Sequence, residues 1–231
     1  MLDALKQQVC EANLALVRAG LVVQTFGNVS GIDRASGRVV IKPSGVSYDA
    51  MKLEHMVVVA LDTGKVVEGD LRPSSDTPTH LVLYRAFPTV GGIVHTHSLY
   101  ATAWAQAKRD IPAFGTTHAD YFYGPILCTR AMTPKEIKSA YEENTGRVIV
   151  ERFKKLNPEQ FPGAIVASHG PFAWGENAAD AMHHAVVVEY LAQLASETLK
   201  IAPRTPAMPR ALLDKHFLRK HGPSAYYGQK R

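Results

Sequence analysis

The chain has 231 residues, of which 46% are hydrophobic and 20% charged, a composition typical of a globular protein with a sizeable core. No stretch approaches the roughly 20 apolar residues that span a bilayer. Residues 1–6 show no basic segment leading into an apolar one, so we expect neither a membrane partner nor a signal peptide. The net charge of +5 suits an anionic substrate, but two tryptophans and no aromatic–basic alternation argue against nucleic acid.

The chain has two cysteines, Cys10 and Cys128, which is too few for a disulfide framework. A reducing compartment, the cytoplasm, is therefore the expected location. The most basic stretch, 215–221, is interpreted as a solvated helix face or a subunit contact.

In the first half of the chain, apolar spacing predicts a helix over 3–19, with Asp3 as its cap and Gly20 as its end. Short apolar runs separated by turn residues indicate strands in antiparallel hairpins, at 21–23, 39–41 and 56–60. A helix over 78–87, with Asp76 or Thr77 near its N-cap, precedes a strand that carries His95 and His97. A helix over 101–107 follows.

In the second half, Thr133 as cap and Glu136 as its capping-box partner predict a helix over 134–155. A strand over 164–168 leads to His169, and Asn177 caps a long helix over 178–199. Three prolines form a stiff linker to a last helix over 210–221. This mixture predicts an α/β sandwich with a mostly antiparallel sheet, built as one domain over 1–231 with a C-terminal arm from about 203 to 231.

Three histidines are the most informative residues of the sequence. Residues i and i+2 of a strand point to the same face, so His95 and His97 can converge on one ion, and His169 can join them from a neighbouring strand end. Three imidazoles with an open position suit catalytic zinc, although manganese, cobalt or nickel could also bind. The alternative is that each histidine packs with one ordinary hydrogen bond.

Asp76 has two interpretations. It precedes a predicted helix and can cap it, or its carboxylate can lie beside the metal, as a ligand or as a group that orients a ligand.

Three segments could hold a phosphate group, because each offers backbone N–H groups, hydroxyls or an amide without a bulky neighbour. They are residues 27–30, residues 42–46, where Lys42 adds a charge, and Ser74-Ser75 at a predicted helix start. Each could also be an ordinary turn.

Residues 116–124 are dense in groups that can move protons, and Asp120 is their candidate acid/base group. Tyr227, in a tail that could reach another subunit, is a second candidate. The alternative is an irregular loop whose aromatic residues pack against the core.

Taken together, these stretches resemble the class II (zinc) aldolase/epimerase family, and in particular its pentulose-phosphate epimerase branch. The match runs nearly end to end and rests on motifs of which several are long and uninterrupted: Thr25–Ser30, Ile41–Val46, Arg72–His80, Gly92–Ser98, Gly115–Gly124, Ser168–Gly175, and Leu213–His216 through Tyr226–Gln229.

The resemblance implies a three-layer sandwich, with a central, mostly antiparallel sheet flanked by helices, assembled as a cyclic homotetramer with sites between subunits. It also assigns roles to residues. It implies that zinc binds His95, His97 and His169, with Asp76 beside the metal. It implies acid/base chemistry at Asp120 and Tyr227, and further site contacts at Thr116, Glu142 and His216. The residues that it implies for binding the substrate's phosphate group are Gly27, Asn28, Lys42, Ser44, Gly45, Ser74 and Ser75.

The activity that the resemblance implies is the interconversion of L-ribulose 5-phosphate and D-xylulose 5-phosphate, by zinc-assisted cleavage and re-formation of the C3–C4 bond. L-arabinose breakdown or an ascorbate-type pentose route is the implied setting. One alternative is a zinc aldolase that releases its fragments, against which Asp76 argues because the family's aldolases carry glutamate there. Another is a non-catalytic module that binds a sugar phosphate.

Overall fold

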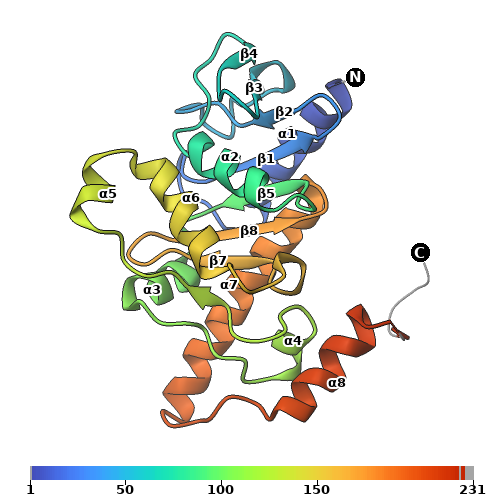
Figure 1. The fold of residues 1–231 in the computed structure, drawn as a ribbon, viewed down its shortest axis with the longest axis vertical. Coiled ribbons are helices and arrows are strands. Elements are labelled where there is room, and N and C mark those ends of the chain that lie inside the picture. Colours follow the sequence, from blue (N-terminus) through green and yellow to red (C-terminus); the bar gives the residue numbers. More distant parts are fainter. Residues whose placement is uncertain (1, 224, 227–231) are drawn as a thin grey trace.

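The computed structural model describes residues 2–223, 225 and 226, and its centre is one sheet (Figure 1). The sheet has eight strands in the order β4-β3-β2-β1-β5-β8-β7-β6, and only the pair of β6 with β7 is parallel. The strands are β1 (Asn28–Asp33), β2 (Arg38–Ile41), β3 (Val57–Ala60), β4 (Val66–Glu68), β5 (Gly92–His95), β6 (Leu127–Cys128), β7 (Gly163–Ile165) and β8 (Pro171–Gly175). The predicted, mostly antiparallel sheet is confirmed.

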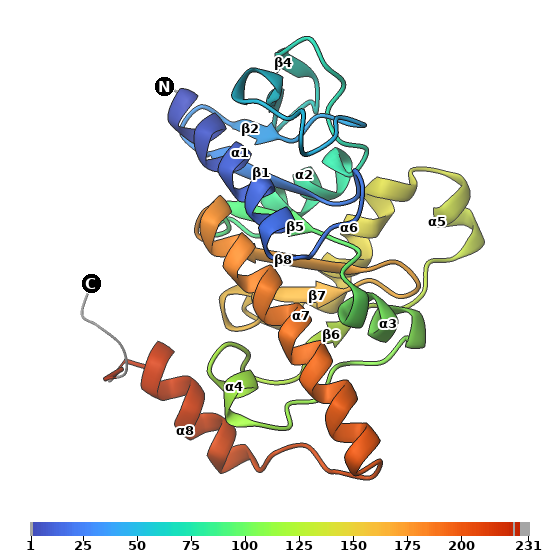
Figure 2. The ribbon, with the colours of Figure 1, turned by 180° about the vertical axis from the view of Figure 1, so that it is seen from behind.

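Helices cover both faces of the sheet, which makes the predicted three layers. The helices are α1 (Asp3–Arg18), α2 (Thr77–Ala86), α3 (Leu99–Ala107), α4 (Thr116–Ala119), α5 (Pro134–Lys138), α6 (Tyr141–Arg152), α7 (Ala178–Ile201) and α8 (Arg210–His221), with 3-10 turns η1 (Leu53–His55) and η2 (Pro158–Gln160). Helices α2 and α6 pack together on one face (Figure 1), and α1 and α7 cover the other (Figure 2). None of the helices in this described part is long and apolar enough to cross a membrane.

Most predicted helices are confirmed, but two details were wrong. Asp3 is the first residue of α1 and not its cap, which is Leu2. The helix predicted over 134–155 is two helices, α5 and α6, because Ser139 leaves helical geometry with φ −98° and ψ −108°. The capping box of Thr133 with Glu136 and the Asn177 cap of α7 are both present.

The strand predictions were less accurate around the candidate site. Residues 21–23 form no strand. The chain there is irregular, and Gln24 adopts φ +54°. Strand β5 ends at His95, two residues before His97, and β7 ends at Ile165, four residues before His169. His95 is therefore the last residue of a strand, whereas His97 and His169 lie on the connections that leave the strands.

Two central strands, β1 and β8, were not predicted. Strand β1 places Ser30 against helix α2, where its hydroxyl lies 2.8 Å from the Tyr84 hydroxyl. On its other face Gly31 lies so close to α1 that a Cβ there would be 2.9 Å from Leu5 Cδ1. The polar residues and Gly31, which are typical of a loop, are thus the contacts of a strand buried on both faces.

The C-terminal arm packs at the β6 end of the sheet. Residues 202–209 lead to α8, which lies against α4 (Figure 1). Leu213 and Phe217 of α8 are buried, and Leu213 belongs to a small apolar cluster with Ala113 and Ala119.

Candidate metal centre

The three histidines meet where β5 and the β7–β8 connection leave the sheet. Strand β5 pairs with β8, and His95 lies directly opposite Phe172. His97 follows two residues after His95, and His169 lies in the turn just before β8. One potential ligand atom from each lies within 4.8 Å of the other two. The predicted convergence is therefore confirmed, although it is achieved by connections and not by alternation within one strand.

The surroundings of His95 fix which of its nitrogens faces the cluster. Its Nδ1 lies 2.9 Å from the backbone oxygen of Pro171, which can only accept a hydrogen bond, so Nδ1 carries the proton. The Nε2 lone pair is left free and lies 3.1 Å from His97 Nε2. The ring of Phe172 stacks on His95 at 4.2 Å between centroids and holds its orientation.

The other two rings are also suited to bind a cation. Burial, followed by the neighbouring His95, lowers the pKa of His169 to about 3 and lowers that of His97, so both are neutral at neutral pH. His169 Nδ1 is buried and has no hydrogen-bond partner. His97 is exposed, which gives the cluster an open side. Three converging imidazoles, one buried nitrogen without a hydrogen-bond partner and an open side fit a divalent metal ion.

Asp76 lies beside this cluster at the predicted N-cap position of α2, but its side chain does not cap the helix. Its side chain makes no capping hydrogen bond and instead accepts one from Asn28 Nδ2 at 2.7 Å. Burial raises the pKa of the Asp76 carboxyl, but its electrostatic interactions with the His95 and His80 rings and the Asn28 hydrogen bond outweigh that effect, and the net shift is downward. The structure thus favours an ionised carboxylate next to the histidines. Its direct ligation of a metal stays a prediction.

The three predicted phosphate segments lie next to one another. Ser74 N–H donates to Lys42 O, and Ser44 N–H donates to Arg72 O, each at 2.9 Å. Asn28 Nδ2 donates to Ser74 Oγ at 3.0 Å, which joins residues 27–30 to the same place. Ser44, Gly45 and Ser75 are exposed around these contacts. Gly27 has φ +79°, and a Cβ there would lie 2.9 Å from His95 O, so this position requires glycine.

Lys42 supplies a buried positive charge at this place. Its side chain is 2% exposed and lies over the Tyr48 ring, 4.9 Å from the centroid. Its Nζ donates to Pro43 O at 3.3 Å, and no carboxylate of the described residues forms an ion pair with it. Burial lowers the pKa of Lys42. A buried ammonium without an anionic partner is suited to an anionic ligand.

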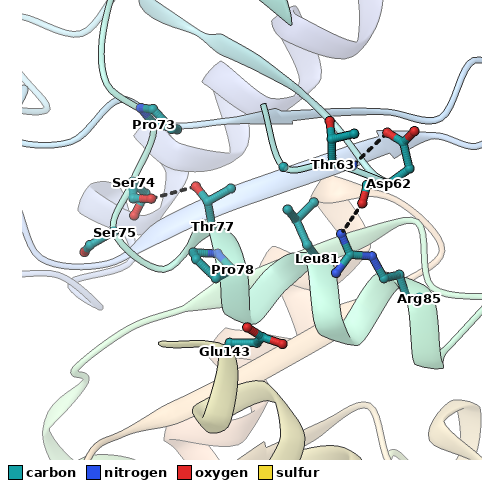
Figure 3. Close-up of a pocket in the computed structure, with 11 residues that line it drawn as sticks. Asp62, Thr63, Pro73, Ser74, Ser75, Thr77, Pro78, Leu81, Arg85 and Glu143 are labelled. Atoms are coloured by element: carbon teal, nitrogen blue, oxygen red, sulfur yellow. Dashed lines mark hydrogen bonds between the residues drawn. The ribbon is translucent and has the colours of Figure 1, made fainter. Parts of the chain in front are cut away.

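A surface cavity adjoins the phosphate segment at Ser74 and Ser75 and runs along α2. Figure 3 shows Ser74 and Ser75 at one wall, and Pro78, Leu81 and Arg85 along the helix. The guanidinium of Arg85 is already bound to the backbone oxygens of residues 61 and 62. None of the three histidines lines this cavity, so it is distinct from the histidine cluster.

Asp120 and His216 lie together, but away from the histidine cluster of the same chain. Asp120 ends α4 and accepts hydrogen bonds from His216 Nδ1 at 3.1 Å and from Arg219 at 3.0 Å, both on α8. Thr116 is the exposed first residue of α4. The hydrogen bonds and ion pairs described for the Asp120 side chain are all with α8. Tyr227 lies outside the described residues.

Glu142 is on the histidine side of the molecule. It lies in the first turn of α6, where its backbone oxygen accepts a hydrogen bond from the Thr79 hydroxyl of α2. Its neighbour Tyr141 lies 6.1 Å from His169, centroid to centroid, and was missed by the sequence analysis. An aromatic residue at a helix start carries no pattern that could have singled it out.

His80 was also missed, although its spacing held a signal. It lies one helical turn after Asp76 and is fully buried, with Nδ1 2.7 Å from Ser30 Oγ and Nε2 without a partner. Burial lowers its pKa to about 3. An i, i+4 pair of Asp and His on one helix could have suggested that both side chains face the same site.

Buried His118 predicts that the protein, stripped of metal by a chelator, loses stability in acid. Burial lowers the pKa of His118 to about 4, so His118 stays neutral in the folded state, whereas it takes a proton near pH 6.5 when unfolded. Its contribution to stability is therefore present above about pH 6.5 and declines by up to about 1.4 kcal/mol per pH unit below it. Urea unfolding of His118→Gln should show about 2 kcal/mol less loss between pH 6.5 and 4.5. Equal losses in the two proteins would contradict this assignment.

Gly170 is predicted to be essential to the histidine cluster. A Cβ there would lie 2.8 Å from Thr96 O and 3.1 Å from His97 Cδ2, so Gly170→Ala must move the turn that carries His169. We expect weaker metal binding and a loss of roughly 1–3 kcal/mol of stability. Gly115→Ala is the matched control, because nothing lies within 4 Å of the Cβ it adds. Chelator competition and thermal unfolding measure both effects, and equal behaviour of the two variants would refute the prediction.

A family model places this fold and cluster in a known class. The model described as the class II aldolase and adducin N-terminal domain matches residues 7–196. The chain belongs to this family, which confirms the resemblance found in its sequence.

Similar proteins extend the comparison over the whole chain. L-ribulose-5-phosphate 4-epimerase UlaF of Salmonella paratyphi C and of Salmonella choleraesuis are each 58% identical to it over 229 residues, 99% of this chain and 100% of theirs. Among solved structures, an L-fuculose 1-phosphate aldolase has a TM-score of 0.78 at 25% identity, covering 92% of this chain and 94% of its own. The L-fuculose-1-phosphate aldolase of Thermus thermophilus has a TM-score of 0.68 at 23% identity, covering 88% and 98%.

Proposed function

We propose that this chain is an L-ribulose-5-phosphate 4-epimerase, which interconverts L-ribulose 5-phosphate and D-xylulose 5-phosphate by inverting C4. The observation that carries the proposal is the identity of 58% over 99% of the chain to proteins of that name. The three clustered histidines and the adjoining phosphate segments support it, because this reaction needs a Lewis acid near a phosphate grip.

The substrate's chemistry explains why the site needs these groups. The hydrogen on C4 is not acidic, because the carbonyl is at C2, two bonds away. Breaking the C3–C4 bond avoids that problem: a base takes the C4 hydroxyl proton, C4 becomes an aldehyde, and the bonding electron pair passes to C3 to form an enediolate. When the aldehyde presents its other face, the bond re-forms and the new C4 oxygen takes a proton.

His95, His97 and His169 would hold the metal, with Asp76 beside them. We infer zinc, since three imidazoles with an open position suit it, with manganese as an alternative. A bound divalent ion supplies Lewis-acid stabilisation of the negative charge that develops on the ketone side. Asp76, ionised and held by Asn28, adds a fixed negative charge next to the cation.

The phosphate grip has to retain the aldehyde fragment between cleavage and recombination. We assign it to Gly27, Asn28, Ser44, Gly45, Ser74 and Ser75, with Lys42 as the charge behind them. Holding both fragments keeps the effective concentration of the aldehyde high, which favours re-formation of the bond over escape.

Proton transfer on the two faces of the aldehyde needs two groups, and we assign them to Asp120 and Tyr227. Because the side-chain bonds of Asp120 go to α8 and not to its own chain's histidines, we infer a homotetramer in which the site is shared between subunits. Thr116, Glu142 and His216 would complete this shared site, and His216 would orient Asp120 through its 3.1 Å contact.

The cellular setting follows from the proposed substrate. We infer a cytoplasmic enzyme of L-arabinose or ascorbate-type pentose breakdown. The two cysteines, both buried and unpaired, are compatible with a reducing compartment.

A sugar-phosphate aldolase that releases its fragments is the second candidate, favoured by the similarity of the fold to L-fuculose 1-phosphate aldolase. Aspartate at position 76 argues against it, since the family's aldolases carry glutamate there as the acid/base group. A non-catalytic module that binds a sugar phosphate is a third candidate.

The test begins with protein stripped by a chelator. Zinc or manganese is added back with L-ribulose 5-phosphate, and D-xylulose 5-phosphate is followed with a coupled enzyme. We expect turnover only with metal. Ligand binding without turnover at any metal concentration would revive the binding-module interpretation.

A further inference from the structure

Helix α3 begins directly after the histidine pair, and a residue from α7 holds its first turn. Glu189 accepts hydrogen bonds from two backbone N–H groups of α3, Tyr100 N at 2.8 Å to Oε1 and Ala101 N at 2.9 Å to Oε2. The first turn of a helix has free N–H groups that normally bind a local cap. Here the local residue, Ser98, makes no capping bond, and its buried hydroxyl has no partner.

We propose that Glu189 is a positioning residue for the metal centre: it clamps the start of α3 to α7 and thereby sets the place of His97 and of the turn that carries His169. The inference rests on the proposed metal site, and it assigns a function to a residue far from His97 in the chain.

The position of helix α3 affects the positions of two of the three histidines, His97 and His169. His97 is two residues before its first residue, Leu99, so a shift of the helix start moves His97 directly. The His169 turn is attached to the last turn of the same helix, because Ser168 N–H donates to Ala105 O at 2.8 Å. Ser168 adopts φ +62°, a left-handed conformation unusual for serine, which restricts how this turn can adjust.

Helix α7 is the support that the three histidines share. It packs against β5, which carries His95, against β8, which follows His169, and against α3. A second attachment holds the far end of α3, where Trp104 Nε1 donates to Ala192 O at 3.1 Å. Glu189 therefore attaches to α7 the end of α3 that lies nearest His97. Trp104 attaches to α7 the end that lies nearest the Ser168 contact.

A carboxylate is better suited to this task than a neutral side chain. Its two oxygens accept from two N–H groups at once, and its negative charge favours the positive end of the helix dipole. In Glu189→Gln one oxygen is replaced by an NH₂ group that faces a backbone N–H, so one bond is lost and two donors oppose each other.

The test compares the metal affinity and the stability of two variants that each lose a helix cap. Glu189→Gln loses the α3 clamp. Asn177→Ala is the matched control, because it loses the side-chain cap of α7 at the start of that helix, where the backbone packs on Gly92 at the opposite end of β5 from His95. Dissociation constants for zinc come from chelator competition, and unfolding temperatures of the stripped proteins come from thermal scans.

We expect both variants to unfold at lower temperature, but only Glu189→Gln to bind zinc more weakly, by roughly tenfold or more, with one ion still bound at saturation. Equal zinc affinity of Glu189→Gln and the unmodified protein would overturn the inference, since a merely structural cap predicts that result. If the unmodified protein binds no zinc, the proposed metal site fails instead, so the two failures are distinguishable.

Glu189→Asp is the second variant, and it keeps the inference testable if Glu189→Gln does not fold. It retains the charge but is shorter by one methylene, so it cannot reach both N–H groups in the same place. We expect an intermediate weakening of zinc binding, and an unchanged dissociation constant would count against Glu189 as a positioning residue.

Discussion

A variant with asparagine in place of His97 is expected to lose metal binding and epimerisation together. His97 supplies one of the three imidazoles of the cluster, with its Nε2 3.1 Å from that of His95, and an amide cannot replace that nitrogen at the same distance. Loss of a direct ligand should weaken metal binding by roughly 100-fold or more, because loss of a residue that merely supports a ligand already costs about 10- to 100-fold. Metal content after dialysis and the rate of D-xylulose 5-phosphate formation measure the two effects.

His183→Asn is the control for this experiment. His183 is an exposed histidine on α7 whose ring contacts Tyr121, away from the cluster. It should keep both metal and activity. A His97→Asn protein that retained its metal while losing activity would show that His97 acts on the substrate and does not hold the ion.

Replacement of Asp120 by asparagine is expected to slow epimerisation strongly while leaving metal binding intact. Proton transfer by a positioned carboxylate contributes roughly 10²- to 10⁴-fold to a rate, and we expect a loss in that range. Metal binding should survive, because the bonds described for the Asp120 side chain go to His216, Arg219 and Lys220 of α8 and not to the histidine cluster. Steady-state kinetics and metal content distinguish the two outcomes.

The same ion pairs require a control for stability, because Asp120→Asn also weakens the contact between α4 and α8. Asp214→Asn removes a different ion pair of α8, the one with Arg210, and touches none of the proposed site residues. It should keep full activity. Tyr227→Phe should lose epimerisation as Asp120→Asn does, and full activity in both the Asp120 and Tyr227 variants would overturn the assignment of the proton-transfer pair.

The histidine cluster could be predicted because short local patterns encode it. A pair of histidines two residues apart at a strand end has few ways to diverge, and a third at the end of a neighbouring apolar run can reach them. The sequence did not reveal that β5 stops at His95 and that the connections bring the rings together. That arrangement depends on the pairing of β5 with β8, and residues 171–175 gave no strand signal of their own.

The supporting residues could not be predicted for a different reason. Glu189 on α7 and His80 on α2 act through contacts 50 to 89 positions away in the chain, which no local pattern reports. Strand β1 was not predicted because asparagine, serine and glycine usually indicate a turn, whereas here Ser30 provides a hydrogen bond to α2 and Gly31 allows the close approach of α1.

The separation of Asp120 from the histidines indicates that one chain alone does not bring all the proposed site residues together. The sequence places both in one candidate site, but in the folded chain Asp120 lies with α8, at the β6 end of the sheet. An active site shared between subunits reconciles the two, because one subunit can then provide the histidines and its neighbour the proton-transfer groups.

The most direct test of the proposed reaction is a single assay of both possible outcomes of C3–C4 cleavage. Metal-restored protein is supplied with L-ribulose 5-phosphate, and D-xylulose 5-phosphate and free glycolaldehyde phosphate are measured in the same samples. The proposed epimerase forms D-xylulose 5-phosphate without release of the aldehyde, since the phosphate grip retains that fragment. Dihydroxyacetone and free glycolaldehyde phosphate as the main products would contradict the account and make the protein an aldolase.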